Sequence, residues 1–208
     1  MAMMNDEDRA RLESEVQSLC ERGDFDGAAT RALRGIGGEI FSFLLGVHRD
    51  EAAADDAFSG FAEGLWKSLP TFNWSATLRT WAYAIARNIS RMQRRGALRR
   101  DRRVGLASAS VLDEVAEAVR TETLSYIRTE KRTRLEELRQ KLSPEERELL
   151  ILRVDRGLGW NDLARVLAED DQRLDEVDVA REAARLRKRF QVLKERLREM
   201  ARRAGLKT

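Results

Sequence analysis

The chain has 208 residues, of which 42% are hydrophobic and 36% charged, so it has room for one medium domain or two small ones with a folded core. One cysteine and one histidine exclude an internal disulfide and an ordinary zinc site, and no run approaches the roughly 20 apolar residues of a membrane span. The net charge of +3 conceals basic segments separated by acidic ones, which favours discrete contacts with anions over a uniformly cationic surface.

The N-terminal segment is acidic and has no apolar centre of the kind found in signal peptides, so we expect a cytoplasmic protein. Only two prolines occur, and few stretches alternate between polar and apolar residues. We therefore expect an all-α fold. No catalytic constellation or phosphate-binding loop is visible, so we expect a protein that is not an enzyme and has no cofactor, metal or small-molecule substrate.

The first half predicts four helices, over about residues 9–22, 28–47, 50–67 and 78–95, with a non-helical connection at 68–77. The glycines in Gly35–Gly38 weaken the expected continuity of the second helix. The periodicity predicts a compact bundle with these residues at its centre: Phe43, Phe61, Trp66, Trp81 and Ile85.

The helix at 78–95 carries two opposed sets of side chains. Its apolar stripe contains Leu78, Trp81, Ala82, Ile85, Ile89 and Met92, and its opposite face is predicted to contain Tyr83, Arg87, Asn88, Arg91, Arg94 and Arg95. Arginine binds phosphate, tyrosine stacks on bases and asparagine pairs with base edges, so this face predicts nucleic-acid binding. For this helix taken alone, a solvated face of an arginine-rich helix remains an equal alternative.

The second half predicts a linker at about 97–123, which leaves room for a weak helix at Val111–Val119, and then a helix at about 123–141. Ser143, Pro144 and Glu146 form the signature of a capping box that starts the next helix, which stops at Gly157–Gly159. A short helix over Trp160–Ala168, with Asn161 as its cap, precedes a long basic helix. This order of helices is typical of a helix-turn-helix domain.

The last helix carries an apolar stripe with steps of four and three residues, which consists of Val179, Ala183, Leu186, Phe190, Leu193, Leu197 and Met200. A coiled coil shows the same pattern, but Ala183 and Phe190 suit a dimer seam poorly, so we favour packing against the short helices. The acidic stretch at 169–178 leaves the first residue of this helix open.

Together the two halves resemble a bacterial RNA polymerase sigma factor of the extracytoplasmic-function (ECF) class. Residues 54–66 are similar to the family's A-E-D-L-V-Q-E-x-F-x-x-x-W segment, and residues 69–88 to its L-P-x-F and F-R-T-W-L-Y-R-I-A-R-N motifs. Residues 142–153 are similar to its L-P-x-x-x-R-E-V-L-x-L-R motif. Ser59 stands where the family usually has glutamine, and Gly60 and Gly64 lie in a helix that is normally free of glycine.

The resemblance implies three parts: a region 2-like domain at 9–96 that binds core RNA polymerase and the −10 element, a linker at 97–123, and a region 4-like helix-turn-helix domain at 124–204 that binds the −35 element. It assigns polymerase binding to Asp55, Asp56 and Ser59. It assigns −10 DNA binding to Asn73, Trp74, Ser75, Tyr83, Arg87, Asn88, Arg91, Arg94 and Arg95. It assigns −35 DNA binding to Arg181, Arg185, Lys188 and Arg189.

The partners that the resemblance implies are core RNA polymerase and promoter DNA, and it leaves room for an anti-sigma factor. The loop at 73–77, with Asn88, would receive a base flipped from the non-template strand. Two other classes remain open on the residues alone. One is a helix-turn-helix regulator that binds duplex DNA without polymerase, and the other is an all-helical interaction protein with no DNA role.

Overall fold

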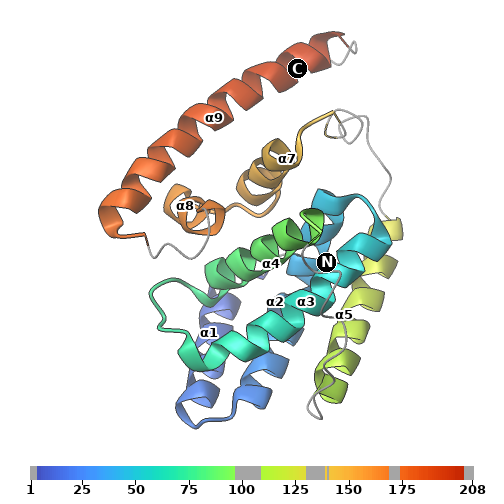
Figure 1. Cartoon of the computed structure of the whole chain (residues 1–208), viewed down its shortest axis with the longest axis vertical. Coiled ribbons are helices and arrows are strands. Elements are labelled where there is room, and N and C mark those ends of the chain that lie inside the picture. Colours follow the sequence, from blue (N-terminus) through green and yellow to red (C-terminus); the bar gives the residue numbers. More distant parts are fainter. Residues whose placement is uncertain (1–3, 97–108, 130–138, 140, 169–173, 204–208) are drawn as a thin grey trace. The chain divides into compact units, whose positions relative to one another are not determined.

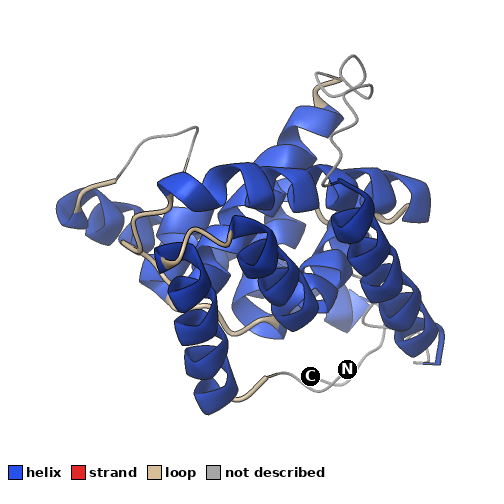
Figure 2. Ribbon diagram, turned by 90° about the horizontal axis from the view of Figure 1, so that it is seen from below, coloured by secondary structure: helices blue, strands red, loops and turns tan. Residues whose placement is uncertain are grey.

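The computed structural model describes residues 4–96, 109–129, 139, 141–168 and 174–203. All the regular structure in these described parts is helical, as Figure 2 shows, which confirms the predicted all-α class. The chain divides into two compact units, residues 1–129 and 130–208, which are described separately below.

The described residues of the first unit form five α-helices and one short 3-10 helix, whose arrangement is drawn in Figure 1. They are α1 (Asp6–Glu21), α2 (Phe25–His48), α3 (Glu51–Ser68), η1 (Leu69–Thr71), α4 (Leu78–Arg94) and α5 (Ala109–Thr129). Local capping fixes where α1 to α4 begin, because an oxygen of the N-cap side chain accepts a hydrogen bond from a backbone N–H in the first turn of each. The four caps are Asn5, Asp24, Asp50 and Thr77. The helix α2 runs without a break through Gly35–Gly38.

The core of the first unit is built around α2, which packs against α1, α3, α4 and α5. Its largest fully buried aromatic side chains are Phe41, Phe43, Phe58, Phe61 and Tyr83. Phe41 and Phe58 lie with ring centroids 5.2 Å apart, and Phe43 meets Tyr83 edge to face at 5.4 Å. Edge-to-face contacts of this kind add to the hydrophobic contribution of the buried rings.

Trp66, Trp81 and Ile85 do not belong to this core, contrary to the prediction from periodicity. All three are only partly buried. The indole Nε1 of Trp66 donates a 2.6 Å hydrogen bond to Asp26, and the ring of Trp81 stacks on Phe72. An amphipathic side chain keeps its polar atom near the surface when a carboxylate is within reach there, which explains Trp66.

Two glycines bring α3 and α4 close together. A Cβ atom added at Gly60 would lie 2.9 Å from Cγ2 of Ile89, and one at Gly64 would lie 3.2 Å from Cγ2 of Ile85. The half-buried isoleucines of α4 therefore fit against the bare backbone of α3. The glycines that depart from the family pattern thus have a packing role, because a larger residue would push the two helices apart.

The sequence predicts a linker over 97–123 that leaves room for a weak helix at 111–119, whereas the structure has a longer helix that is packed into the first unit. Residues 109–123 form most of this helix, α5, which runs alongside α2 and α3 in Figure 1. Leu112, Val115 and Ala116 are buried, so α5 contributes an apolar face to the first unit. Residues 97–108 lie outside the described residues. The helix predicted over about 123–141 coincides with α5 as far as Thr129, and residues 130–138 are also outside that range.

The second unit contains α7 (Pro144–Leu150), a π-helical turn η3 (Ile151–Asp155), α8 (Trp160–Leu167) and α9 (Glu176–Arg203). The predicted capping box is confirmed, since Ser143 Oγ accepts from the Glu146 N–H and the Glu146 carboxylate accepts from the Ser143 N–H. Asn161 is not the cap of α8, because Gly159 occupies that position. The predicted stripe of α9 is buried from Val179 to Leu193, and α9 packs against α8 and α7.

None of the helices in the described ranges is both long and apolar enough to cross a membrane.

Candidate functional site

The sequence pattern predicts that Tyr83 and Arg87 lie on a solvated face of α4, but this prediction is wrong. Both side chains are buried in the first unit. Tyr83 is fully buried and Arg87 is 8% exposed. They share the buried side of α4 with Leu78, Ala82, Ala86 and Ser90. The small residues of this side allow close packing, and partners on α2 satisfy the hydroxyls of Tyr83 and Ser90, so the helix is rotated relative to the prediction.

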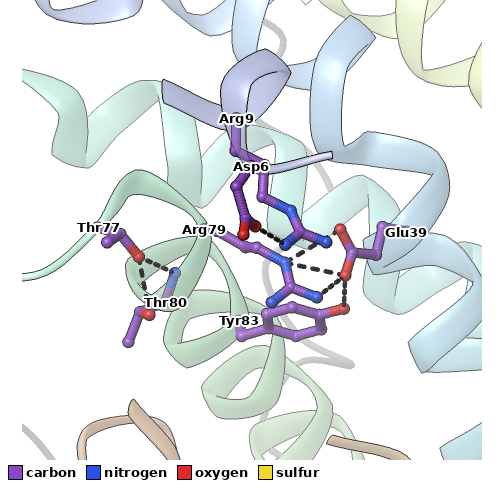
Figure 3. Close-up of polar contacts among 7 residues, drawn as sticks. All are labelled: Asp6, Arg9, Glu39, Thr77, Arg79, Thr80 and Tyr83. Carbon is purple, nitrogen blue, oxygen red and sulfur yellow. Dashed lines mark hydrogen bonds and ion pairs between the residues drawn. The ribbon is translucent and has the colours of Figure 1, made fainter. Parts of the chain in front are cut away.

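The principal partner on α2 is Glu39, which binds two residues of α4 (Figure 3). Its carboxylate accepts a hydrogen bond of 2.8 Å from the Tyr83 hydroxyl and one of 3.0 Å from Nε of Arg79. The Arg79 and Glu39 side chains are only 15% and 11% exposed. Burial opposes the charge of Arg79, but the hydrogen bond and charge of Glu39 outweigh it and raise the pKa of the guanidinium. The guanidinium therefore stays charged, and its contact with Glu39 fixes the first turns of α4 on α2.

A contact from α1 fixes the beginning of α4. The backbone N–H of Leu78 donates a 3.1 Å hydrogen bond to the Glu13 carboxylate, and the N-cap Thr77 binds the N–H and hydroxyl of Thr80. Four N–H groups at a helix start lack partners within the helix, and here two of them are satisfied. The loop that ends at Thr77 is thus held in place from both α1 and α4.

The loop before α4 carries an aromatic stack. Phe72 lies parallel to Trp81 with ring centroids 4.1 Å apart and an interplanar angle of 10°, and its ring centroid is 4.6 Å from that of Trp74. Trp74 adopts a left-handed backbone conformation with φ of 57°, which is uncommon for a bulky residue. Asn73 and Ser75 are exposed, and Asn73 Oδ1 accepts from the Ser75 N–H at 3.2 Å. Phe72 and Trp81 therefore belong to the candidate site. The sequence pattern predicts Phe72 in a non-helical connection and Trp81 in the core.

A single stripe of α4 connects this stack with the predicted arginines. Trp81, Asn88, Arg91 and Arg95 follow one another at steps of seven, three and four residues, so they share one side of the helix. The first three are half-buried and Arg95 is exposed. At 1.5 Å per residue this stripe is about 21 Å long, which corresponds to about six nucleotide steps of one DNA strand. We call it the α4 stripe.

The C-terminal end of α4 adds Arg94 and a half-buried imidazole. Arg94 is exposed, and Ser90 Oγ forms a 2.8 Å hydrogen bond with Nε2 of His48 on α2. Burial, supported by the positive charge of Arg94 and opposed by Asp50, lowers the pKa of His48 below its ordinary 6.5. The folded state therefore favours the neutral imidazole.

We expect the ring signals of His48 to titrate with a midpoint below 6.5 in NMR spectra, where the single histidine of the chain needs no assignment. Because the pKa is depressed on folding, this group stabilises the protein fully above pH 6.5, and the contribution disappears as the pH falls through the folded-state pKa. Wild type should therefore lose stability between pH 6.5 and 5 more steeply than His48→Gln. A midpoint at or above 6.5 would contradict the burial argument.

On α3, two of the three residues assigned to polymerase binding contact Arg120 of α5. Nε of Arg120 lies 3.0 Å from Oδ1 of Asp55, and its NH1 group donates a 2.9 Å hydrogen bond to Oγ of Ser59. Asp56 and Ser59 are exposed and Asp55 is partly so. These three residues, on the side of α3 away from its buried Phe58 and Phe61, are called the α3 acidic face.

On α9, the residues assigned to −35 DNA lie within a described helix that begins at Glu176. Arg181, Arg185, Lys188 and Arg189 are all exposed. Asp175 starts the helix, since its carboxylate accepts a 2.7 Å hydrogen bond from the Asp178 N–H. The Asp178 carboxylate is 2.7 Å from NH1 of Arg181 and the Glu182 carboxylate is 3.3 Å from NH1 of Arg185, so two of the predicted DNA contacts have an acidic neighbour. Residues 169–173, which hold the rest of the acidic stretch, are not described.

The second unit also has an aromatic and cationic cluster that the sequence analysis missed. The guanidinium of Arg153 lies 4.7 Å from the centre of the Trp160 ring and that of Arg187 lies 5.8 Å from it. Phe190 meets the same ring edge to face at 5.7 Å. This cluster joins η3, α8 and α9, and the steps between its members in the sequence are too irregular to reveal it.

Among the described residues, no group of three or more histidine, cysteine, aspartate or glutamate side chains is placed to hold a metal ion.

Residues 34–103 match the family model described as Sigma-70 region 2. The match covers about a third of the chain and includes most of α2, all of α3 and α4, and the loop with the aromatic stack. In the comparisons with curated proteins and with solved structures, nothing matches the chain. The family match supports a sigma factor of the sigma-70 family, and with it a role in binding RNA polymerase and melting promoter DNA.

Proposed function

We propose that the protein is an RNA polymerase sigma factor of the ECF class, which directs transcription initiation by binding core RNA polymerase and recognising promoter DNA. One observation carries this proposal: the Sigma-70 region 2 match falls on the segment that holds the α3 acidic face, the aromatic stack and the α4 stripe. The protein then acts by binding and has no catalytic residue of its own. It works in the cytoplasm, where polymerase and DNA are.

The loop at 73–77 and the α4 stripe are suited to the −10 element. An extruded base needs an aromatic surface that replaces the stacking energy it loses, and the Phe72, Trp74 and Trp81 rings provide one. Asn88 lies further along the same stripe and has an amide that both donates and accepts hydrogen bonds. Arg91, Arg94 and Arg95 then hold phosphates beyond the base. Tyr83 and Arg87 act indirectly, because they anchor α4 from inside.

The second unit is proposed to bind the −35 element. The exposed cations Arg181, Arg185, Lys188 and Arg189 lie in the first half of α9, as expected for a helix that inserts into the major groove. Capping by Asp175 fixes the start of this helix. The functional boundaries 9–96 and 124–204 remain proposals, and α5 extends the first unit beyond residue 96.

The alternative is a helix-turn-helix regulator that binds DNA without polymerase, and one experiment separates the two. A labelled promoter duplex is titrated with the protein alone and with the protein premixed with core RNA polymerase. We expect tight, promoter-dependent binding and transcript formation only in the presence of core RNA polymerase. Tight specific binding by the protein alone, with no effect of polymerase, would support the regulator and contradict our proposal.

We expect Asn88→Ala to change the choice among −10 sequences more than the overall affinity. A base-reading amide discriminates between sequences by about 1–3 kcal/mol, whereas an arginine acts on any phosphate. In vitro transcription from a library of −10 variants should show relaxed preference for Asn88→Ala. The matched control Arg95→Ala, on the same stripe, should reduce transcription from all promoters alike. If both variants give the same uniform loss, Asn88 does not read a base.

A further inference from the structure

Arg120 of α5 makes three polar contacts that together enclose its guanidinium group. It lies 3.0 Å from Asp55, donates 2.9 Å to Ser59 on α3 and donates 2.6 Å to Glu117 on its own helix. Its side chain is 12% exposed, whereas the Asp55 side chain is 47% exposed. A solvent-accessible carboxylate thus has a cation of the same chain placed against it.

Apolar contacts hold α5 in the place that these polar contacts require. Leu112, Val115 and Ala116 are buried. Val119 packs onto α2 at Gly37, where an added Cβ would lie 3.1 Å from Cγ1 of Val119. Gly37 therefore permits α5 to approach α2 closely at Val119, which is the residue before Arg120.

We propose that α5 is an internal competitor for the α3 acidic face, with Arg120 occupying the position that a cation of core RNA polymerase takes in the complex. This inference rests on the proposed function, since it assumes that α3 docks on polymerase. Asp55 and Ser59 become available only when Arg120 leaves them. Polymerase binding therefore releases at least the part of α5 around Arg120 from α3.

The competition lowers the affinity for polymerase by a factor that depends on how often the α3 acidic face is open. If the face is open in only a fraction of molecules, the apparent dissociation constant increases by the inverse of that fraction. The contacts of Arg120 are partly exposed ion-pair and hydrogen-bond contacts, so we expect this factor to be about five.

The first test is a titration of the labelled full-length protein with core RNA polymerase. Arg120→Ala should bind about fivefold more tightly than wild type. The matched control is Arg31→Ala, which removes another ion pair between two helices, that of Arg31 on α2 with Glu15 on α1. This control should bind like wild type. Equal or weaker binding by Arg120→Ala would overturn the proposal.

A second variant addresses α5 without changing any charge. Val119→Ala removes part of the apolar contact with α2 and should also tighten polymerase binding. Thermal unfolding should show that the variant is slightly less stable than wild type. Hydrogen exchange of the α5 amides gives a readout that does not depend on affinity. These amides should exchange faster in wild type saturated with core RNA polymerase than in wild type alone, and faster in Arg120→Ala without polymerase. Unchanged or slower exchange in the complex would overturn the proposal.

The outcomes separate this inference from the proposed function. If Asp56→Arg abolishes polymerase binding while Arg120→Ala and Val119→Ala leave it unchanged, docking through α3 holds and the competitor role of α5 is wrong. If wild type does not bind core RNA polymerase, or Asp56→Arg binds like wild type, the docking assignment fails and the competitor role fails with it.

Discussion

Replacing Asp56 by arginine is expected to abolish the association with core RNA polymerase while the protein remains folded. The side chain is exposed on α3, and the residues that this helix buries, Phe58, Phe61 and Leu65, lie on its other side. Reversal of a charge against a cationic partner costs several kcal/mol, and a loss of about 4 kcal/mol weakens binding about a thousandfold. A pull-down with core RNA polymerase, followed by titration, measures this effect.

The matched control for Asp56→Arg is Glu21→Arg. It causes the same change in net charge at an exposed position at the end of α1 and should leave polymerase binding unaltered. Circular dichroism and thermal unfolding should show that both variants fold like wild type. Undiminished binding by Asp56→Arg would remove the α3 acidic face from the proposed docking surface.

Glu39→Ala is expected to have the largest effect on stability. Removal of this carboxylate leaves the largely buried Arg79 guanidinium without its counter-ion and the fully buried Tyr83 without its acceptor. Breaking a buried pair from one side typically costs about 3–5 kcal/mol in the free energy of unfolding. Urea denaturation should therefore show a much lower midpoint. Since the same contacts place the first turns of α4, promoter melting should also decline at temperatures where the variant is still folded.

Two further variants bracket the Glu39 result. Glu39→Gln keeps an acceptor for Tyr83 but loses the charge, so its loss of stability should lie between those of wild type and Glu39→Ala. Glu15→Ala breaks a more exposed ion pair between helices, with Arg31, and should cost less than about 1 kcal/mol. If Glu39→Ala and Glu15→Ala unfold at the same urea concentration, the buried network does not hold α4.

The sequence by itself determined the helices of this protein wherever their signals are local. Asp50 and Thr77 cap α3 and α4, and Ser143 with Glu146 forms the capping box of α7. Each of these hydrogen bonds joins residues three positions apart, so the residues that form it stand together in the sequence. The apolar stripe of α9 is likewise a property of one helix, and its steps of four and three residues were sufficient to predict its buried side. The roles of α3 and of the loop before α4 could be predicted because residues 54–66 and 69–88 resemble motifs of the sigma factor family.

Only the tertiary structure decided which side of α4 is buried and what α5 does. Periodicity gave most weight to Trp81, Ile85 and Met92, but the buried side holds Tyr83, whose partner Glu39 is 44 residues away. Arg120 was not distinguishable from other arginines, since its contact Ser59 is 61 residues distant. A polar side chain is buried when a partner compensates for lost hydration, and that partner is chosen by the packing of distant helices. No pattern within one helix shows which distant residue will be that partner. The packing of the helices therefore also decides which cations of this chain remain available to DNA.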